Sequence, residues 1–183
     1  EVPAAGQRID AFLQAGVRGH DLRAIGGVKD DGGTELDSEL GIFAVGTSFA
    51  GHALVMAVFY DNKMTVGHIG DSRLYRQRGS EFVQITRDHS LLQEQMDAGL
   101  ITPEQAATST NKNLVTRALG IDPEVEAEIH SYGVQEGDIF LLCSDGLNDM
   151  IEDDEIQMTL IALRSNLDLT AQQLIQAAND AGG

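Results

Sequence analysis

The stretch His68-Ile69-Gly70-Asp71-Ser72-Arg73 decides the fold, together with Leu141-Leu142-Cys143-Ser144-Asp145-Gly146 further along the chain. Each stretch follows or contains an apolar run typical of a strand, and each ends in small residues and a carboxylate. A strand fixes the backbone and glycine lets it turn sharply, so each motif presents an oxygen ligand at a strand end. Such oxygens suit hard divalent cations, such as Mg²⁺ or Mn²⁺, rather than zinc. Taken alone, each motif is also typical of a plain turn.

The two motifs belong to a series of four segments in a fixed order. The segments are 67–76 (GHIGDSRLYR), 84–90 (QITRDHS), 113–120 (NLVTRALG) and 137–147 (GDIFLLCSDGL). This series resembles the bacterial branch of the PP2C-type (PPM, metal-dependent) serine/threonine protein phosphatases. The resemblance implies an α+β fold, a shortened β-sandwich of antiparallel sheets flanked by helices. It predicts one domain over residues 1–183, in which 53–183 match the family well and 1–52 match it poorly.

The amino-acid composition limits which kinds of binding partner and which cellular location are expected. A net charge of −17 argues against nucleic acid or an anionic membrane as a partner, because there is no basic patch to offset phosphate. The acidic charge fits either plain solubility or a surface that attracts cations. The single cysteine, Cys143, excludes an internal disulfide framework, and its apolar strand favours a buried, inert thiol. Neither an apolar run of ~18 residues nor a signal peptide is visible, so we expect a cytoplasmic protein.

Periodicity and capping residues predict the local structure. We expect the run 53–60 to be an interior strand, because it is apolar on both faces. Strands are also predicted at 40–45, 64–69, 74–77, 82–86, 125–132 and 139–142. Helices are predicted at 9–13, after Ser90, after Thr102, at 113–119, at 151–163 and after Thr170.

The family resemblance implies a centre of two metal ions bridged by a water that attacks phosphorus in line. Mn or Mg is the expected cofactor, and Arg18 falls where the phosphate-contacting arginine of the family lies. The resemblance associates Asp71 and Asp145 with an additional metal beside the bridged pair of ions, and Asp145 also touches the pair itself. These two carboxylates, with Gly146 beside Asp145, are the expected metal residues. Asn113 and Arg117 belong to the expected flap on the substrate side, although their segment also fits plain helix packing. The implied partners are a phosphorylated protein substrate and an opposing serine/threonine kinase.

The chain departs from the family pattern in its first part. Leu22 and Arg23 stand where an acidic pair is expected, and Thr47 stands in place of an Asp-Gly turn. Two long helices expected before Ala53 are absent, and the chain ends at Gly183, before an expected Asp-Asn pair and a last strand. Three explanations fit these departures. The chain is a natural, catalytically degenerate member of the family, it is truncated or rearranged, or its site is completed by groups outside the chain.

The combination of intact later motifs and missing early carboxylates is consistent with two functions. The first is a PP2C-type phosphatase that hydrolyses phosphoserine and phosphothreonine in proteins with a metal-activated water. The alternative is a catalytically degenerate pseudophosphatase that binds a phosphoprotein or a kinase. The missing carboxylates favour the alternative, and the intact later motifs favour the enzyme. Of the other polar residues, we expect His52 and His68 to be core or loop histidines, His89 to serve a turn or cap, and Arg73 to form an ion pair.

Overall fold

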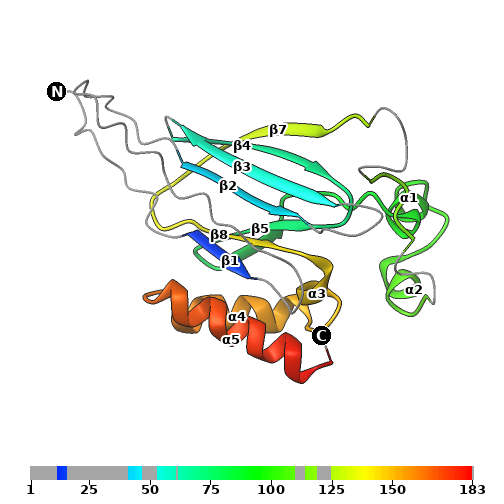
Figure 1. The fold of residues 1–183 in the computed structure, drawn as a ribbon. Coiled ribbons are helices and arrows are strands. Elements are labelled where there is room, and N and C mark those ends of the chain that lie inside the picture. The colour runs from blue at the N-terminus through cyan, green and yellow to red at the C-terminus, as the bar shows by residue number, and fades with distance from the viewer. Residues whose placement is uncertain are drawn as a thin grey trace.

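The computed structural model describes residues 12–15, 41–46, 53–60, 62–109, 114–118 and 125–182, the side chains of the first two stretches and of residue 107 excepted. It consists of two stacked four-stranded sheets and a layer of helices (Figure 1). The helix-covered sheet has the order β1-β8-β5-β6, formed by Phe12–Ala15, Ile139–Cys143, Arg73–Arg78 and Glu81–Gln84. The second sheet has the order β2-β3-β4-β7, formed by Gly41–Gly46, Leu54–Tyr60, Lys63–Ile69 and Glu128–Gly133.

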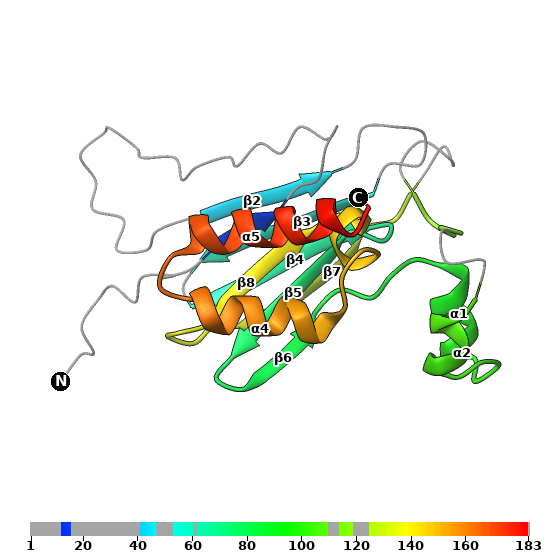
Figure 2. The ribbon, with the colours of Figure 1, turned by 90° about the horizontal axis from the view of Figure 1, so that it is seen from below.

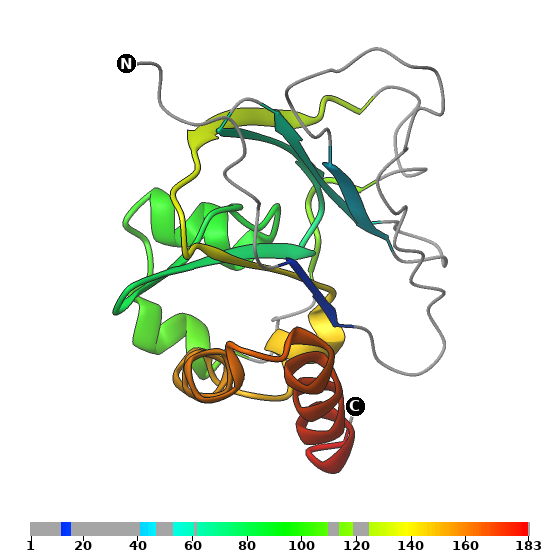
Figure 3. The ribbon, with the colours of Figure 1, turned by 90° about the vertical axis from the view of Figure 1, so that its left-hand side faces the viewer.

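Five helices accompany the sheets in the described part of the chain. They are α1 (Leu91–Asp97), α2 (Pro103–Ala107), α3 (Asp145–Asn148), α4 (Asp153–Leu163) and α5 (Leu167–Asp180). Seen from below, α4 and α5 lie across the helix-covered sheet (Figure 2). Seen from the side, this sheet lies between the second sheet and the two helices (Figure 3). The layered sandwich with flanking helices confirms the predicted α+β fold class.

Strand β8 is the centre of the packing because both of its faces are buried. Leu141 and Cys143 belong to the core shared with α4 and α5, while Phe140 and Leu142 belong to the core between the two sheets. The rings of Phe140 and Phe59 meet edge to face at 5.2 Å between centroids and join the sheets. Because both faces of β8 are buried, residues 139–143 form an unbroken apolar run in the sequence.

Strand β3 lies in the interior of its sheet, between β2 and β4, but the prediction that both of its faces are buried was wrong. Tyr60 pairs with Lys63 across the turn, and Asn62 takes a positive φ of 55° there. Val55, Ala57 and Phe59 are fully buried in β3, but Met56 is 38% and Tyr60 is 57% exposed. Only one face of β3 packs against the helix-covered sheet, so apolar residues on both faces did not mean burial on both faces.

The helix starts were predicted with mixed success. The expected capping box at Thr102 is present, with the side chains of Thr102 and Gln105 each bonded to the other's backbone N–H. The cap expected at Thr170 is wrong, because α5 is capped one turn earlier by Asn166, whose Oδ1 accepts from Leu169 N–H at 3.1 Å. Thr170 is instead buried within the helix and donates to the carbonyls of Leu163 and Asn166.

Two other predicted helices are not helical where the structure describes them. Residues 12–15 form β1, which pairs in parallel with β8, so long-range pairing prevails over the local helical pattern. In residues 114–118, Val115 forms an isolated bridge with Ser90 and its neighbours are bends or irregular backbone. The backbone there is held by bonds from Leu91 N–H to Leu114 C=O and from Thr116 N–H to His89 C=O.

Candidate metal centre

The end of β8 and the start of β5 bring the two acidic motifs to one edge of the helix-covered sheet. Cys143, the last residue of β8, pairs with Arg73, the first residue of β5, in antiparallel register. Asp145 follows Cys143 by two positions and Asp71 precedes Arg73 by two, so both carboxylates lie just beyond the same strand pair. Asp71 also follows β4 of the second sheet, so its turn connects the two layers.

The electrostatics of Asp71 show negative charges converging on this edge. Burial raises the pKa of Asp71 to about 6, and the charge of Asp145 is the next largest cause, followed with the same sign by Asp88 and Asp149. Asp145 itself is exposed, and its Oδ1 accepts from Gly146 N–H at 2.8 Å. The Oγ of Ser72, next to Asp71, is buried and lacks a hydrogen-bond partner among the described residues. The carboxylates of Asp71 and Asp145 and the hydroxyl of Ser72, unpartnered within the described residues, form an oxygen donor set that fits a hard divalent cation, and the raised pKa of Asp71 is what such converging charge produces.

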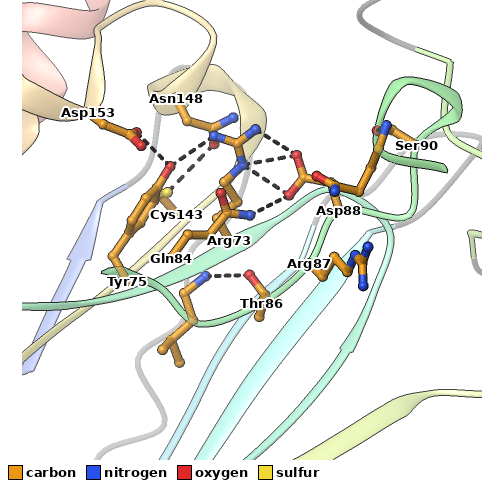
Figure 4. Close-up of polar contacts among 12 residues, drawn as sticks. Arg73, Tyr75, Gln84, Thr86, Arg87, Asp88, Ser90, Cys143, Asn148 and Asp153 are labelled. Atoms are coloured by element: carbon orange, nitrogen blue, oxygen red, sulfur yellow. Dashed lines mark hydrogen bonds and ion pairs between the residues drawn. The ribbon is translucent and has the colours of Figure 1, made fainter. Parts of the chain in front are cut away.

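An arginine holds the start of β5 beside these acids. Nε of Arg73 lies 3.0 Å from both carboxylate oxygens of Asp88, and Nη2 lies 2.6 Å from Oδ2 (Figure 4). Gln84 also donates to Asp88, at 2.8 Å. Arg73 Nη1 donates to Tyr75 Oη, which donates in turn to Asp153 at the start of α4. The predicted ion pair of Arg73 is therefore confirmed, and its network connects β5, the 85–89 segment and the helix layer.

A histidine cluster on the second-sheet side was not predicted from the sequence. The rings of His68 and His89 stack with centroids 4.6 Å apart, and His89 Nε2 lies 3.1 Å from Glu128 Oε2. One ligand atom from each of His68, His89 and Glu128 lies within 4.8 Å of the others. His68 is buried, as expected of a core histidine, but separations of 21 and 39 positions along the chain gave no signal for the cluster. The only feature that indicates the cluster in retrospect is the register of β4 and β7, which pairs His68 with Glu128.

The remaining predicted site residues fall in different places. Arg18 and Asn113 lie outside the described residues, as do His52 and the positions at 22, 23 and 47. Arg117 is exposed, and its positive charge lies near enough to His89 to contribute to lowering the pKa of that ring. Cys143 is fully buried, which confirms the predicted buried thiol, and burial raises the pKa of this thiol to about 12.

Comparison with known proteins supports this picture. The sequence model of the SpoIIE family (Stage II sporulation protein E) matches residues 90–183, just over half of the chain. The protein phosphatase PhpP of Streptococcus pneumoniae is 38% identical over 133 residues, which are 73% of this chain and 54% of that protein. The chain thus spans about half the length of the curated relatives it matches.

Solved structures agree with the sequence matches. The serine/threonine phosphatase PstP/Ppp of Mycobacterium tuberculosis aligns with a TM-score of 0.68 at 38% identity, covering 72% of this chain and 55% of that one. A further structure, the PstP catalytic domain in complex with two manganese ions, aligns with a TM-score of 0.64 at 38% identity, covering 72% and 54%. The chain belongs to the SpoIIE/PP2C-type family of bacterial serine/threonine phosphatases.

Among the residues that the structure describes, none of the helices is long and apolar enough to cross a membrane.

Proposed function

We propose that this chain is the phosphatase domain, or part of it, of a PP2C-type enzyme that hydrolyses phosphoserine and phosphothreonine in proteins. The observation that carries the proposal is the pairing of Arg73 with Cys143, which sets Asp71 and Asp145 at one edge of the sheet. The interaction of the two carboxylates, seen in the raised pKa of Asp71, supports a shared cation. Relatives named as a protein phosphatase and as a serine/threonine phosphatase support the reaction.

In this proposal Asp71 and Asp145, with Gly146 beside the latter, hold Mn²⁺ or Mg²⁺. A bound cation would supply Lewis acidity toward phosphoryl oxygens and would activate a water as the nucleophile. Asp71 and Asp145 supply the negative charge that attracts the cation, and the Arg73–Asp88 pair keeps the start of β5 in place. The proposal assigns Arg18 to the phosphoryl oxygens and Asn113 and Arg117 to the substrate side. Arg117 is exposed and therefore accessible to a phosphoprotein.

The proposal includes a phosphorylated protein as the substrate, a serine/threonine kinase as the opposing enzyme, and a cytoplasmic location. The names of the relatives support the substrate class. The kinase rests on the family resemblance, and the location rests on the sequence, whose single cysteine excludes an internal disulfide framework.

The test is phosphate release from p-nitrophenyl phosphate and from a phosphothreonine peptide, with Mn²⁺ or with a chelator. We expect Mn²⁺-dependent hydrolysis slower than the ~1 s⁻¹ common among enzymes, because Leu22, Arg23 and Thr47 replace expected carboxylates. Asp145→Asn should abolish it. Asp154→Asn, the same charge change on an exposed residue of α4, should leave it unchanged.

A chain that binds the phosphopeptide but releases no phosphate with Mn²⁺ would overturn the enzymatic proposal and support a binding protein. Hydrolysis at or above ~1 s⁻¹, abolished by a chelator, would show instead that other carboxylates complete the site.

A further inference from the structure

Gly70, the residue before Asp71, has both of its backbone polar groups bonded to one residue. Its N–H donates to His89 Nδ1 at 3.2 Å, and its carbonyl accepts from the backbone N–H of His89 at 2.9 Å. Gly70 takes a positive φ of 95°, and a Cβ built on it would lie 2.6 Å from the Cβ of Ala53. The turn that carries Asp71 therefore depends on glycine for its shape and on His89 for its hydrogen bonds.

The bond to Gly70 determines the tautomer of His89. A backbone N–H can only donate, so Nδ1 of His89 carries the lone pair and the proton of the neutral ring is on Nε2. That proton faces Oε2 of Glu128 at 3.1 Å. Burial lowers the pKa of His89, although its bond to Glu128 acts in the opposite direction, and the neutral ring is the form that accepts from Gly70.

Glu128 and His68, which both contact the His89 ring, make further hydrogen bonds of their own. Oε1 of Glu128 lies 2.7 Å from His130 Nε2, so the carboxylate bridges two histidines. Burial acts to raise the pKa of Glu128, but the bonds from His130 and His89 lower it overall, which keeps the acceptor ionised. His68 stacks on the His89 ring, and its Nε2 donates to the carbonyl of Arg87 at 2.8 Å. The His89 ring is thus oriented at its nitrogens by hydrogen bonds and on its face by stacking with His68.

We propose that His89 is a positioning residue, oriented by Glu128, that holds the Gly70 turn so that the Asp71 carboxylate is placed to bind its cation. The inference rests on the proposed role of Asp71 as a metal ligand. Removing a group that orients a metal ligand typically changes metal affinity about 10- to 100-fold.

The same cluster has a rival interpretation as a transition-metal site, because ligand atoms of His68, His89 and Glu128 lie within 4.8 Å of one another. A metal on Nε2 of His89 would move the ring proton to Nδ1, where it would face the N–H of Gly70. The hydrogen bonds therefore favour the positioning role.

Two substitutions of His89 distinguish the role of its Nδ1 from the role of its Nε2. In His89→Asn, the side-chain oxygen takes the place of Nδ1 and can still accept from Gly70, but Glu128 is out of reach. In His89→Gln, the amide takes the place of Nε2, which retains the Glu128 contact and loses the acceptor for Gly70. Mn²⁺ affinity is measured from the paramagnetic resonance signal of free Mn²⁺, with Asp71→Asn as the reference, and thermal melting checks that each variant is folded.

We expect His89→Gln to weaken Mn²⁺ binding about tenfold or more, and His89→Asn to retain most of the affinity. If Asp71→Asn leaves Mn²⁺ binding unchanged, the proposed metal role of Asp71 fails. If Asp71→Asn weakens binding while both folded His89 variants bind like the parent chain or lose affinity equally, the positioning role is overturned. Co²⁺ added alone tests the rival interpretation. A tetrahedral absorption band that persists in Asp71→Asn but disappears in His89→Gln would replace the positioning role with a metal site.

Discussion

Arg73 and Cys143 are directly paired residues at the ends of neighbouring strands, and this pair determines where the acidic motifs meet. The antiparallel register sends the chain before Arg73 and the chain after Cys143 out of the same edge of the sheet. Because Asp71 and Asp145 are each two positions beyond the pair, a separation of 74 positions in sequence becomes an electrostatic contact.

Asp71→Asn is expected to stabilise the metal-free chain at neutral pH. The pKa of Asp71 in the folded state, about 6, lies above its ordinary 3.8. Its contribution to stability is therefore fully present below pH 3.8 and is lost as the pH rises through about 6. Linkage gives an upper limit of about 3 kcal/mol, and solvent screening of this partly exposed group reduces it to about 1–2 kcal/mol.

Melting curves in a chelator, recorded at several pH values, check this prediction. The advantage of Asp71→Asn should be largest above pH 7 and should disappear as the pH falls toward 3.8. A variant that melts below the parent chain at neutral pH would show that the Asp71 carboxylate makes stabilising contacts that outweigh the charge repulsion.

Divalent cations are expected to raise the melting temperature, because a ligand that binds only the folded state stabilises it. The gain is roughly 2.7 kcal/mol at a hundredfold excess over the dissociation constant. Asp145→Asn should remove most of the rise produced by millimolar Mn²⁺ or Mg²⁺. Asp154→Asn changes the charge equally in an exposed position of α4 and should retain the rise. A melting curve unmoved by either ion up to ~10 mM, well above the affinity range of cation-sensor sites, would exclude a metal site at these carboxylates.

The sequence predicted the strands at the centre of the fold because their signals are local. The unbroken apolar run at 139–142, for example, depends on neighbouring residues only. The acidic edge was predicted because each motif stands at a strand end, and family resemblance brought the two motifs together.

Features that depend on distant pairing could not be predicted in this way. Strand β1 forms only because β8 offers it an edge, so its own four residues carry no sufficient signal. Thr170 has the pattern of a cap, but Asn166 supplies a competing cap one turn earlier, and burial of Thr170 against α4 decides between them. The cluster of His89 and Glu128 joins residues 39 positions apart, for which periodicity gives no information.

Asp88→Ala is expected to destabilise the chain by about 2–4 kcal/mol, because removing one partner leaves the other charge of a largely buried pair uncompensated. The side chains of Arg73 and Asp88 are only 22% and 12% exposed. Glu81→Ala is the matched control, since Glu81 pairs with Arg76 but is 58% exposed, and it should change stability by less than about 1 kcal/mol. Urea unfolding of both variants gives the comparison, and equal losses would contradict a special role for the Arg73–Asp88 pair.

Gly70→Ala is expected to be more damaging than the same change at Gly79, although both glycines have positive φ values, 95° and 56°. A Cβ at Gly79 would have no atom within 4 Å, so only the backbone conformation opposes alanine there, at about 1–2 kcal/mol. A Cβ at Gly70 would lie 2.6 Å from Ala53 Cβ and 2.8 Å from Ala53 Cα, so strands β3 and β4 would have to separate. We expect Gly70→Ala to exceed the loss at Gly79 by at least about 1 kcal/mol, the lower end of overpacking effects.

The double variant Gly70→Ala with Ala53→Gly tests the cause of that loss. Removing the Ala53 Cβ relieves the shorter of the two contacts and leaves the backbone contact at 2.8 Å, so stability should recover in part relative to Gly70→Ala alone. Recovery of Mn²⁺ binding together with stability would indicate that the close approach of Gly70 to Ala53 also places Asp71. Equal stability of Gly70→Ala and Gly79→Ala would contradict the steric argument.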